Sequence, residues 1–230
     1  MVKSLVFDTG PLINLSLNNL LYILPELKKR FDGEFYITES VKRECIDRPL
    51  TSKKFKFEAL QLLKLLEDKT LKVYTNSQLK NRTLNLLKMS NSLFKVHNTY
   101  IKNVQYAEVE VIVASQLLNA NAIVIDEFVT RRIIEDPLSV KDRMERKLHE
   151  KVVVDNKNLK SFKDLVKNIT VIRSFELTIM AYEFGMFEQY LLNIPHPKKT
   201  LLEALLWGIK LNGCSSTEEE IKDTLKIEGI

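Results

Sequence analysis

Two aspartates stand at the ends of short apolar runs, a position from which carboxylates can bind metals or move protons. Asp8 follows LVF at 5–7 and precedes Thr9, a glycine and a proline, while Asp126 follows AIVI at 122–125. Runs of this kind are typical of buried parallel strands. Because the carboxyl ends of parallel strands meet at one edge, where α/β proteins bind ligands, we expect the two carboxylates to lie together. For either aspartate alone, an ordinary turn or helix-capping residue is the alternative.

Three glutamates lie on or beside apolar helix faces. Glu44 borders the stripe formed by Val41 and Cys45, whereas Glu108 and Glu110 both lie in the apolar helix QYAEVEVIVASQLL. A carboxylate on an apolar face costs free energy unless it is paired or coordinates a cation. Periodicity does not choose between Glu108 and Glu110. Glu108 is nearer the helix start, and hence nearer the sheet edge if the helix runs antiparallel to the strands.

Carboxylates crowded together repel one another, and a cation would relieve that repulsion. Mg²⁺ and Mn²⁺ prefer oxygen ligands, so one or two of these ions are the expected cofactor. Such ions activate water and neutralise charge on a phosphodiester. The net charge of +5, from 35 Lys and Arg against 30 Asp and Glu, suits a polyanionic substrate without requiring one. Together these features favour a metal-dependent nuclease.

Three segments, in order along the chain, resemble the PIN-domain family. They are VFDTGPLINL near the N-terminus, ITESVKREC at 37–45, and QYAEVEVIVASQLLNANAIVIDEFVTRR at 105–132. The resemblance implies a three-layer α/β/α fold with a mostly parallel central sheet, and Mg²⁺- or Mn²⁺-dependent cleavage of RNA. Matched position by position, it implies an acidic quartet of catalytic, metal-binding residues: Asp8, Glu44, Glu108 and Asp126.

The same resemblance gives other residues supporting roles. It matches Thr9 to a hydroxyl that supports the site, Glu127 to the second acid of a pair, and Arg131 to a trailing arginine. Because Arg131 and Arg132 follow the acidic strand end, we expect them to contact substrate phosphate. Two positions depart mildly from the family pattern, since Ala107 replaces a glycine and Glu127 replaces an aspartate.

The order of elements predicts one α/β domain with a helical appendage. Six segments are expected to form strands or strand-like pieces: 4–7, 34–37, 71–75, 122–126, 152–154 and 170–174. Their alternation with helices favours a parallel sheet covered on both faces. We expect a PIN-like nuclease domain over 1–184, with a charged insertion at about 133–168, and a C-terminal helical extension over 185–230. The insertion weakens the prediction that the protein is a toxin with an antitoxin-like partner more than it weakens the prediction of a PIN-like fold.

The composition leads us to expect a cytoplasmic protein that does not bind membranes. Cys45 and Cys214 are far apart and form no disulfide framework, which suits a reducing compartment. The N-terminus lacks the layout of a signal peptide. No apolar run approaches the roughly 20 residues needed to span a bilayer.

Several alternatives use these residues differently. Asp8-Thr9-Gly10 also spells the aspartic-protease triplet, but that enzyme needs two triplets or a homodimer within an all-β fold. The helix at 139–151 alternates charges as a solvated helix does, and it is also a candidate clamp for RNA phosphates. Trp207 and its neighbouring leucines are expected to make helix-packing or homodimer contacts. An RNA-binding or assembly module with a vestigial site is the competing function.

Overall fold

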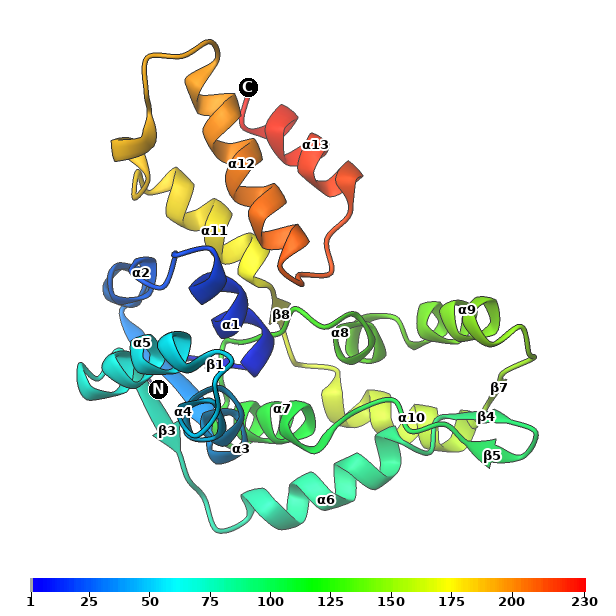
Figure 1. The fold of residues 1–230 in the computed structure, drawn as a ribbon. Helices are drawn as coiled ribbons and strands as arrows, with labels where there is room; N and C mark the ends of the chain where they lie inside the picture. The colour runs from blue at the N-terminus through cyan, green and yellow to red at the C-terminus, as the bar shows by residue number, and fades with distance from the viewer. Residues whose placement is uncertain (1) are drawn as a thin grey trace.

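The centre of the molecule is a five-stranded sheet in the spatial order β3-β2-β1-β6-β8 (Figure 1). The computed structural model describes residues 2–230. The strands of this sheet are β1 (Lys3–Phe7), β2 (Gly33–Thr38), β3 (Leu71–Tyr74), β6 (Ala122–Val124) and β8 (Val171–Ile172). Every neighbouring pair is parallel, so all carboxyl ends share one edge. The prediction of a mostly parallel central sheet is confirmed.

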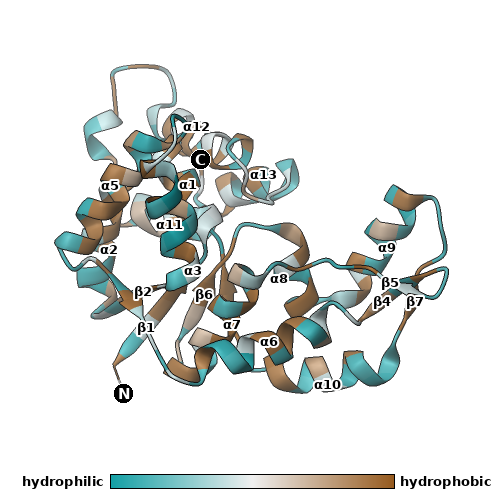
Figure 2. Cartoon of the chain, turned by 60° about the horizontal axis from the view of Figure 1, so that its bottom comes forward, coloured by the Kyte–Doolittle hydropathy of each residue, from teal (hydrophilic) through white to brown (hydrophobic). Residues whose placement is uncertain are grey.

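Helices flank this sheet on both sides, as the predicted α/β class requires. The flanking helices are α1 (Thr9–Leu17), α2 (Ile23–Phe31), α5 (Lys56–Glu67), α7 (Tyr106–Leu118) and α11 (Ser174–Glu183). In both overall views α7 lies on one side of the strands and α1, α2 and α11 lie on the other (Figures 1 and 2). Three shorter helical segments connect β2 to α5: α3 (Glu39–Lys42), the π-helical η1 (Arg43–Asp47) and α4 (Arg48–Leu50).

The sheet is stable because its strands are apolar on both faces. Val6, Phe7, Ile37, Ile123 and Val124 are all fully buried between the helical layers. Continuous apolar runs are what a parallel sheet covered on both faces needs, and each large side chain buried there contributes about 1.5–3 kcal/mol. Among residues 2–230, no helix combines the length and the hydrophobicity that a membrane span requires.

Gly33 allows β2 to start close against β1. It pairs with Lys3, and a Cβ added at this position would lie 2.5 Å from the Lys3 carbonyl oxygen and 2.7 Å from the Phe31 ring. Because the backbone would have to shift, Gly33→Ala is expected to lower the free energy of unfolding by about 2 kcal/mol or more. Denaturant titration measures this loss. Gly10→Ala, whose added methyl would meet nothing closer than 3.6 Å, is the control, and equal midpoints for the two variants would contradict the prediction.

A second, antiparallel sheet combines the strand-like piece expected at 152–154 with two strands that the sequence did not predict. It contains β4 (Phe94–Val96), β5 (Thr99–Tyr100) and β7 (Val153–Val154), in the order β5-β4-β7. The strands β4 and β5 have only three residues and two residues, too few to show a period. His97 and Asn98 join them with φ of 47° and 64°, as a two-residue hairpin turn requires.

Four further helices continue the chain around this second sheet and after β6. They are α6 (Leu79–Ser90), α8 (Phe128–Glu135), α9 (Pro137–Leu148) and α10 (Asn156–Val166). The charged insertion predicted at 133–168 therefore forms α9, β7 and α10, together with the end of α8. It reaches back through β7 to pair with β4.

The C-terminal segment forms η2 (Glu188–Tyr190), α12 (Pro197–Leu211) and α13 (Glu218–Ile227). Helix α12 packs on α11, and α13 packs on α12. Leu202 and Leu206 are fully buried, so these leucines make helix-packing contacts. Gly208 brings α12 against α1, because a Cβ there would lie 2.5 Å from Asn18 Oδ1. The domain boundary at 184 stays a prediction.

The N-terminal cap of α13 corrects a detail of the sequence pattern. Ser216 and Glu219 have the spacing of a capping box. In the structure the reciprocal hydrogen bonds instead join Thr217 and Glu220, one residue later. Both pairs fit the pattern, so the spacing alone does not select the right one; the residue that caps the helix, with an extended backbone, is Thr217.

Candidate functional site

Asp8 lies at the carboxyl end of β1 and begins α1, in the middle of the sheet edge. Its backbone N–H donates to the carbonyl oxygen of Val124 in β6, at 3.0 Å. Gly10 is exposed beside it, and a Cβ at Gly10 would lie 3.8 Å from Asp8 Oδ2 and 3.6 Å from Asp126 Cβ. The two strand-end aspartates therefore flank Gly10, as the parallel topology predicts.

The carboxyl group of Asp8 is only 5% exposed and is surrounded by other acids. Burial raises its pKa from 3.8 to about 7, and the negative charges of Glu108 and Glu44 add to the rise. The backbone N–H groups of Thr9 and Gly10 oppose it. Glu44 and Glu108 come from distant parts of the chain, so the fold brings three of the four predicted acids together.

Glu44 reaches this cluster from a π-helical turn. Thr38 caps α3 by accepting from the Val41 N–H, and the helix then widens into η1, which contains Glu44. Single π-helical turns are frequent at functional sites. The Thr9 hydroxyl donates to Glu44 Oε2 at 3.1 Å, so Thr9 contacts the acid cluster directly. Burial raises the pKa of the neighbouring Cys45 thiol to about 12, so this thiol stays protonated and serves packing.

The geometry separates Glu108 from Glu110, which the sequence pattern does not. Glu108 Oε2 accepts from the Gln105 N–H at 2.9 Å and from the Thr130 hydroxyl at 2.8 Å. Burial is the largest of the effects that raise its pKa, and neighbouring acids add to it. Glu110 is directed elsewhere, because its Oε2 accepts from the Ser40 N–H at the start of α3. Glu108 therefore belongs to the acid cluster, and Glu110 joins α7 to α3.

Glu127 lies beside Glu108 at the start of α8. Its carboxylate caps that helix by accepting from the Thr130 N–H at 2.7 Å. Thr130 therefore contacts two acids, through its N–H to Glu127 and through its hydroxyl to Glu108. The negative charge of Glu127 helps to raise the pKa of Glu108.

Asp126 differs from the other acids because its carboxylate is fully hydrogen-bonded. It is 2% exposed, and it accepts from the Ser174 N–H at 2.8 Å, the Ser174 hydroxyl at 2.6 Å and Asn14 Nδ2 at 3.0 Å. Within the described part of the chain, no three His, Cys, Asp or Glu side chains are arranged to enclose a metal ion. In this structure Asp126 is the member of the quartet directed into the protein.

The sequence analysis missed Asn14 and Ser174, which bond Asp126, as well as Thr130, which bonds Glu108 and Glu127. Asn14 also donates to the carbonyl oxygen of Ile209 in α12, at 2.9 Å, which ties the C-terminal extension to the site. Its signal in the sequence is a single polar residue within the apolar run LINL, on the buried face of α1. Ser174 starts α11 directly after β8 and shows no such signal, because only the parallel pairing of β8 with β6 brings it to Asp126.

The two arginines proposed for substrate phosphate occupy different environments. Arg131 is 8% exposed, and its guanidinium donates to Glu135 at 3.1 Å and to the Ser215 carbonyl oxygen at 3.3 Å. It is directed inward and fixes the loop before α13. Arg132 is half-buried, with its guanidinium 5.8 Å from the centre of the Phe128 ring. Phosphate contact by either arginine stays a prediction.

Sequence comparison assigns the family. A family model described as a PIN domain matches residues 4–137, which include all the acids above and both arginines. The chain belongs to the PIN-domain family. The match ends at the start of α9, so α9, β7, α10 and the C-terminal helices lie beyond the part that the family defines. No curated protein matches the chain.

A solved structure with a distant likeness to this PIN-domain protein is that of VapBC2 from Rickettsia felis bound to a DNA fragment from their promoter. The two chains are 12% identical, the match covers 74% of this chain and 98% of the other, and the TM-score is 0.42.

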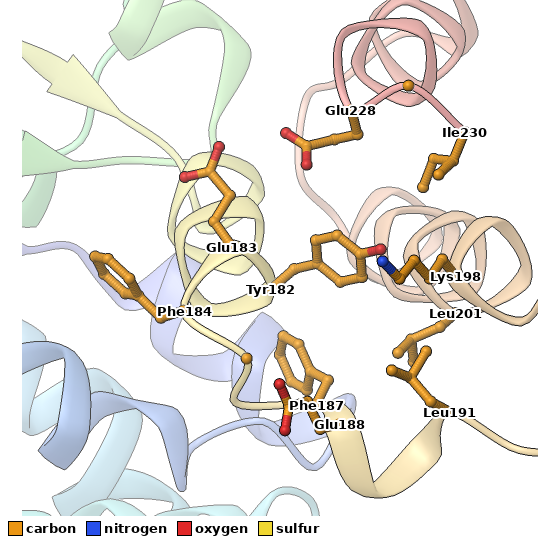
Figure 3. Close-up of a pocket in the computed structure, with 12 residues that line it drawn as sticks. Tyr182, Glu183, Phe184, Phe187, Glu188, Leu191, Lys198, Leu201, Glu228 and Ile230 are labelled. Carbon is orange, nitrogen blue, oxygen red and sulfur yellow. The ribbon is translucent and has the colours of Figure 1, made fainter.

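A cavity near the C-terminal helices lies away from the acids. It measures about 490 Å³ and is enclosed by α11, η2, α12 and the end of α13. Figure 3 shows the side chains of Glu183 and Glu228 near each other on one side of the cavity. The Tyr182 side chain extends toward Lys198. Burial raises the pKa of Glu228, and the adjacent Glu183 raises it further. This cavity lies between the end of α11 and the C-terminal extension, and none of the predicted site residues lines it.

Proposed function

We propose that this PIN-domain protein is a metal-dependent endoribonuclease that hydrolyses RNA phosphodiester bonds at Asp8, Glu44, Glu108 and Asp126. PIN domains are generally nucleases. The observation that carries the proposal is the environment of Asp8, a buried carboxyl whose pKa is raised to about 7 by burial and by two glutamates. Such a cluster costs folding free energy, and strongly shifted pKa values of this kind are concentrated at functional sites.

The donor set fits a hard divalent cation. Asp8, Glu44 and Glu108 offer only carboxylate oxygens, and no thiolate or imidazole is among them, which suits Mg²⁺ or Mn²⁺. One or two ions would be held by the quartet. When bound, the cation supplies an activated water and neutralises charge that develops on the phosphate.

The surrounding residues hold these carboxylates in place. Thr9 orients Glu44 through its hydroxyl, and Thr130 with the Gln105 N–H fixes Glu108 Oε2, which leaves Oε1 for a ligand. Hydrogen bonds from outer residues set the direction and basicity of metal-binding carboxylates. Glu127 supports Glu108 through the shared Thr130. A homodimer, an antitoxin-like partner and a cytoplasmic location stay predictions.

One observation favours a second candidate, a PIN-fold RNA-binding module with a vestigial site. Asp126 uses its carboxylate within the protein, so a cation would have to be held by the other three acids. A cleavage assay distinguishes the two functions, because the module would bind RNA with Mn²⁺ present and leave it intact.

The test is cleavage of end-labelled RNA and DNA with Mg²⁺, with Mn²⁺ and with EDTA. We expect RNA to be cleaved only with a divalent ion. Glu108→Gln should reduce the rate at least about 10²-fold, since it removes a carboxylate of the cluster. Glu110→Gln is the matched control, because it makes the same change two residues away at a side chain bonded to Ser40. Cleavage unaffected by EDTA, or equal losses in the two variants, would disprove the mechanism.

A further inference from the structure

The positive charge of the chain is concentrated in one part of the fold. We call this part the basic lobe and define it as residues 79–102 and 137–167, which form α6, β4, β5, α9, β7 and α10. It contains 14 Lys and Arg against five Asp and Glu, whereas the rest of the chain contains 21 against 25. The net charge of +5 is therefore the sum of a basic lobe and an acidic remainder.

These cations are mostly free of ion pairs. Within the lobe, Glu145 pairs with Lys141 at 3.0 Å and Asp155 pairs with Lys95 at 3.7 Å. The other 12 Lys and Arg of the lobe are exposed, and none forms an ion pair with any residue in 2–230. Exposed cations without partners are available to a polyanion and carry counterions that binding would release.

A solvated, charge-alternating helix does not account for this pattern. Such a helix pairs its charges along one face, as Lys141 and Glu145 do in α9. Residues 79–102 instead contain five Lys and Arg and no acid. The antiparallel pairing of β4 with β7 then joins this segment to the insertion, so two basic segments far apart in the sequence form one lobe.

The lobe adjoins the acid cluster. In both overall views α9 and the small β4-β5-β7 sheet lie beyond α8 from the central strands, and α6 lies beside α7 (Figures 1 and 2). The Arg143 guanidinium of α9 lies 4.1 Å from the centre of the Phe128 ring. Phe128 directly follows Glu127, and Thr130 in the same helix bonds Glu108. A strand lying on the lobe would therefore reach the carboxylates past Arg143.

We propose that the basic lobe binds the sugar–phosphate backbone of a nucleic acid strand and leads that strand to the acid cluster. The identification of this strand as a substrate rests on the proposed function, whereas its binding by the lobe does not. Arg143, exposed over the half-buried Phe128 ring, places one of the lobe's cations at the junction between the lobe and the acid cluster, where it can contact a phosphate.

The test measures binding without cleavage. In EDTA, fluorescence anisotropy first selects the tightest ligand among single-stranded RNA, single-stranded DNA and a duplex. Its dissociation constant is then measured against KCl concentration for two triple variants. The lobe variant carries Arg143→Gln, Lys147→Gln and Lys151→Gln. The control variant carries Lys198→Gln, Lys199→Gln and Lys222→Gln, which are also exposed and outside any ion pair among residues 2–230.

We expect the lobe variant to bind at least about 10-fold more weakly and to lose about two units of the log–log salt slope, since each phosphate contact contributes about 0.7 to 0.9. The control variant should change affinity less than about 2-fold, which is the effect of general charge alone. Equal losses in the two variants, or none in the lobe variant, would overturn the proposal. If thermal melting shows that the triple lobe variant is unfolded, Lys147→Gln and Lys151→Gln singly provide the same comparison.

Failure of this proposal is distinguishable from failure of the proposed function. Binding through the lobe without cleavage in Mn²⁺ would end the nuclease proposal and leave the lobe assignment intact. If the wild type cleaves RNA but the lobe variant binds as tightly as the wild type, the lobe assignment is wrong and the nuclease proposal stands.

Discussion

Asp8→Asn is expected to abolish RNA cleavage and, in metal-free buffer, to make the protein more stable. The loss of activity should be at least about 10³-fold, because the variant removes the central carboxylate of the cluster. The gain in stability arises from the same carboxylate. At pH 8 the folded wild type must keep it ionised in a buried site beside Glu44 and Glu108, whereas an amide has no charge to bury.

The size and pH dependence of this gain follow from linkage. The pKa of Asp8 rises from 3.8 to about 7 on folding, so between these values the folded state binds a proton that the unfolded state has released. The stability of the wild type therefore falls as pH rises through this window. A difference of about three pKa units corresponds to about 4 kcal/mol above pH 7, and the variant avoids it. Near pH 4 the two proteins should differ little.

Urea unfolding of both proteins in EDTA at pH 4.5, 6 and 8 measures this effect. Asp164→Asn, at an exposed aspartate outside any ion pair among residues 2–230, is the control and should show no such trend. Adding Mn²⁺ at pH 8 should stabilise the wild type more than Asp8→Asn, because a ligand stabilises the state that binds it. A variant that is less stable than the wild type at every pH would contradict the environment described for Asp8.

The two strand-end aspartates could be predicted from the sequence, whereas the conformation around Glu44 and the choice of Glu108 over Glu110 could not. Asp8 and Asp126 each follow a run that only a buried strand explains, so the sheet edge and its two carboxylates could be inferred from local pattern. The sequence correctly predicts a helical segment around Glu44, but hydrophobic periodicity does not indicate that this segment forms a π-helical turn. The choice of Glu108 over Glu110 depends on Ser40 and Thr130, which meet α7 only in the folded chain.

Long-range packing explains what remained hidden. The sequence shows the charge of the insertion at 133–168, but the pairing of β4 with β7 that makes it a lobe rests on strands too short to recognise. Likewise, Asn14 and Ser174 are 160 residues apart and meet at Asp126 through the crossover from β6 to β8. Contacts of this kind are set by topology, and no window of neighbouring residues contains them.

Asp126→Asn, the same isosteric change at the other strand end, is expected to destabilise the protein by about 3 kcal/mol as well as to reduce cleavage. Asp126 Oδ1 accepts from the Ser174 N–H, and Oδ2 accepts from the Ser174 hydroxyl and Asn14 Nδ2. An amide would present its NH₂ to one of these sets of donors. Asn14 cannot turn over to accept without losing its hydrogen bonds with Ile209 and Asn18. A buried donor left facing another donor costs about 1–3 kcal/mol, and the charge-assisted bonds are lost in addition.

The same Asp→Asn substitution should therefore change the free energy of unfolding in opposite directions at the two aspartates. Urea unfolding in EDTA at pH 8 should show Asp8→Asn above the wild type and Asp126→Asn below it. Ser174→Ala removes one donor to Asp126 and should fall between Asp126→Asn and the wild type, because the other two donors remain. If both Asp→Asn variants stabilise the protein, Asp126 is an uncompensated charge like Asp8, and the hydrogen-bond network that turns it inward is wrong. Opposite signs would instead support Asp126 as the acid whose hydrogen bonds maintain the sheet edge around Asp8, Glu44 and Glu108.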